Sequence, residues 1–359
     1  MSQSSTITKN NSISFFRIVF TLLIVLLHCT YTQGGYIGVE FFFLVSGVLL
    51  AKSIYEKDIS IKEFFVHRLK RLYPMYLFAN LFYLVVYAML NSYHLGLGIK
   101  GFPAEFIEKI GLDWRSFFML QFFGPVRPDS YFILWYVVVL FWLSLLFFII
   151  SKIMPKNVFT IFVGITVAAV LIYIFISTGN LDLWKESRFF VSEGFFRGYL
   201  DIGIGILLYN VKKLADRKIE LGHPLFRVIE IIGYASIIIV AWNLRRTKWD
   251  FLLLLIMAIC VTISFSEHKK GILNNKAVNV MSKFSYAVYL LHPIFLIASE
   301  YYSVPFELPP RFFRFVYDIT VTVVCAVLSE LLIGLLMQKI ENHHSRKKHR
   351  KDMATSNRL

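Results

Sequence analysis

The chain has 359 residues, of which 57% are hydrophobic and 17% are charged. This composition and the mean hydropathy of +0.62 exclude an ordinary soluble globular domain and are typical of a polytopic membrane protein. The formal net charge of +15 does not indicate a nucleic-acid partner, because the basic residues form short clusters between apolar runs and no nucleic-acid motif accompanies them. All three cysteines fall in apolar runs, where we expect them to be packing residues.

A membrane span needs about 20 mainly apolar residues, and ten segments of the chain meet this requirement. They lie near 14–32, 36–54, 72–90, 132–153, 158–176, 192–211, 226–243, 250–266, 285–302 and 312–337. We therefore expect an all-α membrane domain of ten helices over residues 1–340. A basic cytoplasmic tail over residues 341–359 would contact anionic lipids.

Clusters of Lys and Arg follow the second, fourth, sixth, eighth and last spans. The positive-inside rule places these clusters and both termini in the cytoplasm. The cluster Arg245, Arg246 and Lys248 after the seventh span contradicts this pattern. Either it is a local exception, paired with Asp250 or an anionic ligand, or the boundary between spans seven and eight is misplaced.

One outer connection, residues 91–131, is about 40 residues long and mixes aromatic with acidic side chains. Long connections of this kind are usually functional, so we expect a lid or wall of a site at the outer face. The alternative is an interfacial amphipathic helix that only seals the bundle.

Two ionisable residues in the first span, Arg17 and His28, mark it as part of a functional site, because such groups are costly in hydrocarbon. Eleven residues at about 100° each place both side chains on one helix face, with Arg17 about 16 Å deeper toward the cytoplasm. Glu40, early in the second span, is expected at the depth of His28. A carboxylate there would orient the imidazole as a general base; the alternative is a hydrogen bond that only joins the two helices.

Arg68 and Arg71 stand three residues apart at the cytoplasmic start of the third span. This spacing places both guanidinium groups on one side of a helix, where they can bind phosphate oxygens of a cytosolic cosubstrate. The alternative is ordinary snorkelling of basic side chains toward the membrane surface.

The sixth span carries Glu193, Arg197 and Asp201 at successive steps of four residues. We expect a structural ion-pair ladder, and a substrate channel is the second interpretation. Further ionisable residues in later spans, His292 among them, indicate that the bundle encloses a polar interior. The sequence has no zinc-ligand cluster, so no metal is expected, and no phosphate-binding glycine loop.

Five short stretches follow one another along the chain in a specific order. They are Arg17 to His28, an Arg-x10-His spacing; Gly38 to Gly47, which reads GVEFFFLVSG; Arg68 to Pro74, which reads RLKRLYP; Leu134-Trp135-Tyr136; and Ser285 to His292, which contains Tyr286 and reads SYAVYLLH. Together these stretches resemble the motifs of acyltransferase family 3, the multi-span membrane acyltransferases that include bacterial O-acetyltransferases of surface polysaccharides.

The resemblance implies that an acyl group, usually acetyl, moves from cytosolic acyl-CoA to a hydroxyl of an extracytoplasmic glycan or glycolipid. It implies an enzyme of the bacterial cytoplasmic membrane, surrounded by lipid and working beside polysaccharide-synthesis proteins. By the same resemblance, His28 would be the catalytic histidine and Glu40 its partner. Arg68 and Arg71 would contact the CoA phosphates, with Arg17 also meeting the donor. Further candidate site residues are Trp135, Tyr136, Arg197, Tyr286 and His292.

Two questions stay open at this level. His28 could deprotonate the acceptor hydroxyl for direct transfer, or carry the acyl group itself in a covalent relay. A rival function is a transporter or flippase for a lipid-linked saccharide or a small anion, and a third is a scaffold subunit of an export machine.

Overall fold

The computed structural model describes residues 11–29, 31–121, 123, 131–184, 187–188, 190–219, 221–244, 246–266, 276–302 and 311–356. Arg245 and part of the long connection, residues 124–130, lie outside the described residues. The elements are α1 (Asn11–His28), η1 (Gly35–Ile37), α2 (Gly38–Glu56), α3 (Ile61–His94), η2 (Gly98–Lys100), α4 (Phe102–Leu112), α5 (Trp114–Phe117), η3 (Phe132–Leu134), α6 (Trp135–Ile153), α7 (Lys156–Ser177), β1 (Ser187–Arg188), β2 (Val191–Ser192), α8 (Glu193–Lys218), α9 (Pro224–Asn243), α10 (Trp249–Ser264), α11 (Lys276–Tyr302) and α12 (Arg311–Ser356).

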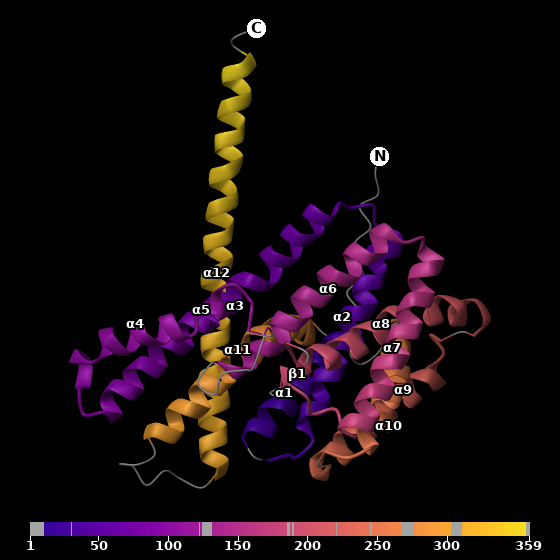
Figure 1. Cartoon of the computed structure of the whole chain (residues 1–359), viewed down its shortest axis with the longest axis horizontal. Helices are drawn as coiled ribbons and strands as arrows, with labels where there is room; N and C mark the ends of the chain where they lie inside the picture. Colours follow the sequence, from indigo (N-terminus) through magenta and orange to yellow (C-terminus); the bar gives the residue numbers. More distant parts are fainter. Residues whose placement is uncertain are drawn as a thin grey trace.

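The described chain is a bundle of long apolar helices, with one two-residue hairpin between β1 and β2 (Figure 1). Among the residues that the structure describes, seven helical segments are long and apolar enough to cross a membrane: Gly35–Glu56, Ile61–His94, Phe132–Ile153, Lys156–Ser177, Pro224–Asn243, Lys276–Ala298 and Phe315–Ile340. The chain is therefore an all-α polytopic membrane protein, as predicted. The other three expected spans are also helices, but α1 and α10 are shorter and α8 carries several charges.

The α2–α8 pair makes the most extensive helix contact in the bundle. Gly47 on α2 faces Gly205 on α8, and a Cβ at Gly47 would lie 2.8 Å from the Gly205 Cα and closer still to the carbonyl oxygen of Ile202. Small residues let two backbones approach in this way, which is the usual basis of tight helix packing in membranes. The glycine at the end of the GVEFFFLVSG stretch is thus required by the crossing of α2 and α8.

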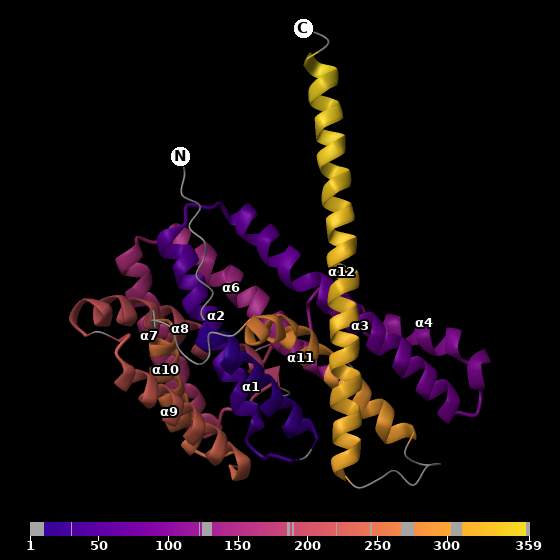
Figure 2. The same ribbon diagram turned by 180° about the vertical axis from the view of Figure 1, so that it is seen from behind.

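The long connection between α3 and α6 has two parts with different positions. Its first part, α4, folds back along α3, and this hairpin projects to one side of the bundle (Figures 1 and 2). Its second part, around α5, inserts between helices: the Tyr73 and Tyr76 hydroxyls of α3 donate to the Phe117 and Ser116 carbonyls. The described connection is therefore a hairpin followed by a segment that is hydrogen-bonded to α3, and its expected role as a lid or wall of a site stays a prediction.

The last helix, α12, is continuous over 46 residues and packs on α11. Most of its apolar side chains are exposed to the surroundings of the bundle, as expected of a helix that faces lipid. Figure 2 shows α12 extending past the bundle on the side where α2 ends and α3 begins. Residues 341–356 continue this helix rather than starting a separate element.

Candidate active site

His28 is the last residue of α1, where a half-buried imidazole meets two other rings. The His28 and Phe132 ring centroids are 5.3 Å apart, and the His28 and His292 centroids are 5.2 Å apart. Phe132 begins the short turn before α6, and His292 lies in the middle of α11. Since α1 packs on α11, the structure brings together the two histidines that the sequence motifs placed about 260 positions apart.

His292 is buried, with 1% of its surface exposed. Its Nδ1 lies 2.8 Å from the Tyr289 carbonyl oxygen, so Nδ1 carries the proton and the Nε2 lone pair is free to accept. Nε2 has no hydrogen-bond partner within the described residues. An acceptor nitrogen next to His28 is suited to receive a proton or to bind a hydroxyl group that enters between the rings.

Glu40 does not pair with His28, and this prediction is wrong. Both carboxylate oxygens accept hydrogen bonds from Arg197: Nε donates to Oε1 at 2.8 Å, and Nη2 donates to Oε2 at 2.9 Å. The two side chains are 0% and 1% exposed. A guanidinium fork offers two charge-assisted hydrogen bonds, which a neutral imidazole cannot match in a low-dielectric interior.

The predicted ladder along α8 is also rearranged. Arg197 reaches across to Glu40 on α2, because the close crossing of α2 and α8 brings that carboxylate within range. Asp201, one turn further along α8, is fully buried, and neither of its carboxylate oxygens has a hydrogen-bond partner within the described residues. Arg197 also donates from Nη2 to the Tyr36 carbonyl at 2.8 Å. The core of the bundle thus holds one buried ion pair with a second carboxyl group beside it.

Arg17, Arg68 and Arg71 all lie within electrostatic range of Tyr136, and their expected role as contacts to the donor stays a prediction. All three interact electrostatically with the hydroxyl group of Tyr136, which also hydrogen-bonds Ser46 of α2. Arg17 and Arg68 each interact with the charge of Arg71 as well. Across the described parts of the chain no carboxylate forms an ion pair with any of the three. Three cations on two helices therefore share a site without a protein counter-charge.

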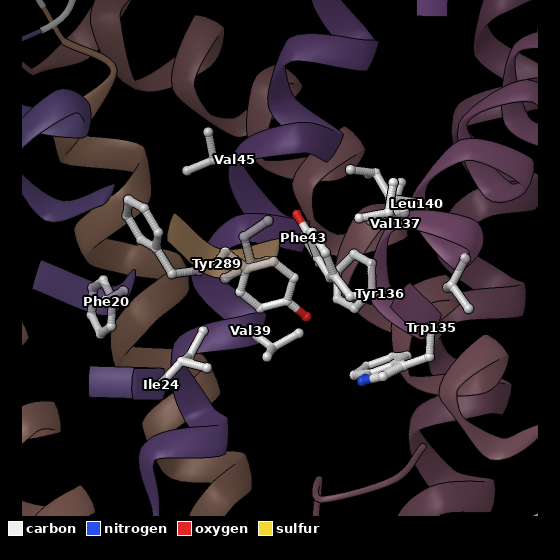
Figure 3. Packing of buried hydrophobic residues seen from close by; sticks show 14 of the residues in the cluster. Phe20, Ile24, Val39, Phe43, Val45, Trp135, Tyr136, Val137, Leu140 and Tyr289 are labelled. Carbon is white, nitrogen blue, oxygen red and sulfur yellow. The ribbon is translucent and has the colours of Figure 1, made fainter. Parts of the chain in front are cut away.

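Aromatic motif residues connect the arginines with the histidines, because Tyr136 lies near the arginines and the Tyr289 ring centroid is 6.1 Å from that of His292. Figure 3 shows Tyr136 and Tyr289 side by side between the helices, and their ring centroids are 5.3 Å apart. The Tyr286 hydroxyl donates to the Leu72 carbonyl at 2.9 Å, which ties α11 to the turn of α3 that follows Arg71. Trp135 lies 5.5 Å from the Arg197 guanidinium and covers the ion pair. Tyr286 and Trp135 thus position the charged groups.

A polar network at the same end as His28 includes residues that the sequence did not single out. Tyr36 donates to both carboxylate oxygens of Asp250 at 3.1 Å, and the backbone N–H of Arg246 donates to the Tyr36 hydroxyl at 3.0 Å. The Arg246 side chain pairs with Asp182 at 2.8 Å rather than with Asp250, and this hydrogen bond raises the pKa of Arg246. Helix α9 ends at Asn243 and α10 begins at Trp249, on either side of this loop, so the predicted boundary between the seventh and eighth spans was correct.

The arrangement has a polarity that suits transfer between two sides. Arg17 and His28 lie on one face of α1, about 16 Å apart along its axis. The arginines Arg17, Arg68 and Arg71 lie at the level of the first, and the imidazoles of His28 and His292 lie at the level of the second. Among the described residues no group of three His, Cys, Asp or Glu side chains is placed to hold a metal ion.

Comparison with known proteins identifies the family of the chain. The family described as "Acyltransferase domain", acyltransferase family 3, matches residues 10–330. The chain belongs to this acyltransferase family. The match confirms the resemblance drawn from the five motifs and covers every helix that contributes to the site.

Curated relatives of this acyltransferase include the O-acetyltransferase OatA of Staphylococcus aureus strains NCTC 8325 / PS 47, COL and MRSA252. Each is 24% identical over 348 residues, which cover 89% of this chain and 55% of the relative. The chain thus spans about half the length of the curated relatives it matches. No solved structure matches the chain.

Proposed function

We propose that this acyltransferase moves an acetyl group from cytosolic acetyl-CoA to a hydroxyl of an extracytoplasmic glycan or glycolipid. The enzyme would work in the bacterial cytoplasmic membrane with ten spans and both termini in the cytoplasm. The position of α12 supports this topology, because its basic extension leaves the bundle on the side where the basic α2–α3 connection lies. The O-acetyltransferase name of the relatives supports the acetyl group.

The observation that carries the donor proposal is the cluster of Arg17, Arg68 and Arg71. Three cations near Tyr136 that have no carboxylate partner among the described residues repel one another, and the partial burial of Arg17 and Arg68 adds a desolvation cost. An anionic ligand removes this cost. Guanidinium groups bind phosphate oxygens in forked pairs, so the phosphates of CoA are the ligand that fits the cluster.

At the other level, His28 would act on the acceptor. The acceptor hydroxyl oxygen attacks the acyl carbonyl carbon, the carbon–sulfur bond breaks, and CoA leaves as a thiolate that takes a proton from cytosolic water. His28 accepts the hydroxyl proton and later releases it to water. In the relay version, a ring nitrogen of His28 first bonds to the acyl carbon as the thiolate leaves, and the hydroxyl then displaces it.

The test of the reaction uses membrane vesicles with labelled acetyl-CoA. We expect His28→Gln to lower acetyl transfer by about 10²- to 10⁴-fold, the usual contribution of a general base. His67→Gln, which changes an exposed histidine on α3, serves as the matched control and keeps wild-type transfer. Full transfer by His28→Gln would refute the proposal, and saccharide flux without an acetylated product would favour a transporter.

The test of the donor site compares two donors. Acetyl-CoA carries the phosphates, whereas S-acetylpantetheine has the same thioester without them. Arg68→Ala/Arg71→Ala should raise the KM for acetyl-CoA by more than tenfold, since each charge-assisted contact contributes about 1.5–3 kcal/mol. The KM for S-acetylpantetheine should not change. Lys70→Ala, which removes an exposed charge between the two arginines, should leave both values unchanged.

An equal loss with both donors would show that the arginines support the fold rather than bind phosphate. Unchanged KM values for both donors would place the phosphates elsewhere. Either result would overturn the assignment of this cluster to the donor.

A further inference from the structure

Two connections, residues 178–184 before the β1–β2 hairpin and residues 244–248 between α9 and α10, meet at the end of the bundle where His28 lies. The Arg246 guanidinium of the second bonds the Asp182 carboxylate of the first, and the two side chains are 65% and 14% exposed. The charge of Asp182 also acts on His28. An ion pair with an exposed arginine and a largely buried aspartate therefore lies within electrostatic range of the candidate catalytic imidazole.

Both connections are held by buried groups. Asp250 accepts from the Leu181 backbone N–H at 2.8 Å and from the hydroxyl of Tyr36, and that hydroxyl accepts from the Arg246 N–H. Asp250 is fully buried. Arg246 has φ +36°, in the left-handed region that non-glycine residues rarely adopt. Such conformations persist where the surroundings enforce them, and they cluster at ligand sites.

Aromatic side chains extend the same surface toward the reacting end. Trp184, two residues after Asp182, lies 5.7 Å from Phe132 between ring centroids, and Phe132 lies 5.3 Å from His28. Both aromatic side chains are half-buried, so part of each ring is accessible. The rings of His28, Phe132 and Trp184 follow one another at these distances, and the ion pair of Asp182 with Arg246 begins two residues before Trp184 in the chain. Together these side chains form a patch of imidazole, aromatic and ionic groups.

We infer that this patch, made of Phe132, Trp184, Asp182 and Arg246 beside His28, binds one neutral pyranose ring of the acceptor. This inference rests on the proposed function and names the substrate class of its acceptor side. The apolar face of a pyranose ring packs on aromatic side chains, and its ring hydroxyls need donors and acceptors held at fixed positions. Trp184 and Phe132 supply the aromatic surface, and the Asp182–Arg246 ion pair supplies the donors and acceptors.

The charges of the patch favour a neutral ring over an anionic one. Arg246 uses its Nε for Asp182, which leaves its two η nitrogens as donors, while the second oxygen of Asp182 can accept from a hydroxyl. Because Asp182 already balances the guanidinium charge, an added phosphate or carboxylate would meet the repulsion of that carboxylate. Neighbouring hydroxyls of an uncharged sugar can instead use one donor and one acceptor together.

The experiment measures acetyl transfer and binding with the full-length protein in nanodiscs. The probes are methyl hexopyranosides as neutral rings, methyl glucuronoside as an anionic ring of the same shape, and an undecaprenyl-linked hexose as the lipid-linked form. Transfer kinetics give the KM of each probe and of acetyl-CoA. Binding of acetyl-CoA, measured separately, reports an intact donor site.

We expect Arg246→Ala and Trp184→Ala to raise the KM of the neutral glycosides by at least tenfold while the KM of acetyl-CoA stays unchanged. Arg246→Lys keeps the positive charge but loses the forked guanidinium group, so it should raise the KM of the neutral glycosides by an intermediate amount. Lys248→Ala, which removes an exposed cation from the same connection, is the matched control and should behave as wild type. In Arg246→Ala and Trp184→Ala, the KM of the lipid-linked hexose should rise as much as that of the free glycoside, because the protein recognises the sugar ring.

Three results would overturn the inference. One is an unchanged glycoside KM in Arg246→Ala with acetyl-CoA binding intact. A second is tighter binding of methyl glucuronoside than of the neutral rings, which would make the patch an anion site. A third is an effect of Arg246→Ala that appears only with the lipid-linked hexose, which would assign Arg246 to the lipid phosphate. Failure of the proposed function is distinguishable, because acetyl-CoA would then neither bind nor donate in the wild-type protein.

Discussion

Replacing Glu40 by Gln separates a structural from a reactive role for this carboxylate. The substitution keeps the shape of the side chain but leaves the Arg197 guanidinium, 1% exposed, without its ionic partner. Removing one member of a buried ion pair costs about 3–5 kcal/mol, because the remaining charge is left uncompensated. We expect Glu40→Gln to lower the free energy of unfolding by this amount.

The size of this loss in the free energy of unfolding depends on Asp201. Its carboxylate lies one turn from Arg197 and has no hydrogen-bond partner within the described residues, so it can take over the charge of Arg197. The loss from Glu40→Gln should therefore be about 3 kcal/mol, and about 5 kcal/mol when Asp201→Asn is added. Replacing all three groups, Glu40→Met and Arg197→Met together with Asp201→Asn, should restore or exceed wild-type stability, because no charge of this group is then left buried.

The assay is equilibrium unfolding in detergent, followed by circular dichroism, with acetyl transfer measured on the same samples. Glu108→Gln, which changes an exposed glutamate on α4, is the control and should change the free energy of unfolding by less than about 0.5 kcal/mol. Wild-type stability of Glu40→Gln together with lost transfer would refute the structural assignment. That outcome would return Glu40 to the chemistry at His28.

Three further predictions follow from the packing, the polar network and the arginine cluster. Gly47→Ala should lower stability by at least about 1–3 kcal/mol in thermal unfolding, because its Cβ would meet backbone atoms of α8 that cannot move aside. Gly164→Ala, at a position where nothing lies within 4 Å of the added Cβ, should be neutral or slightly stabilising, and equal stability of the two variants would contradict the prediction. Tyr36→Phe should cost about 1–3 kcal/mol in chemical unfolding by removing a donor to buried Asp250, and a loss below about 0.5 kcal/mol would show that water replaces it. Arg71→Ala should stabilise the protein without CoA and destabilise its CoA complex in thermal-shift measurements, since it relieves repulsion among the arginines; destabilisation in both states would argue against a phosphate site.

Local features of the sequence account for most of the fold. Each of the ten apolar segments is mainly helical in the described parts of the chain, because helix hydrogen bonds join residues four apart and hydropathy is a property of the segment itself. The spacing of Arg17 and His28 fixed their common face for the same reason. The family resemblance groups Arg17 with Arg68 and Arg71 on the donor side, and in the structure all three lie within electrostatic range of Tyr136.

The partners of the buried charges depended on the tertiary structure. Sequence placed Glu40 at the depth of His28, but depth alone does not choose between neighbours, and Arg197 with its guanidinium fork is the neighbour that the structure provides. The choice depends on the tight crossing at Gly47 and Gly205, which no single helix encodes. The pairing of Arg246 with Asp182 likewise joins two connections that are 64 positions apart.

The sequence by itself determined which segments are helices, which end of α1 carries each charge, and the family to which the chain belongs. Only the tertiary structure decided that His28 faces His292, that Glu40 belongs to Arg197, and that Asp182 and Arg246 stand beside the histidine. The physical reason is the distance along the chain over which each interaction is determined. Helix formation and hydropathy are set within one turn or one span, whereas an ion pair or a ring contact depends on how two separate helices cross and on which side chains that crossing brings within hydrogen-bond distance.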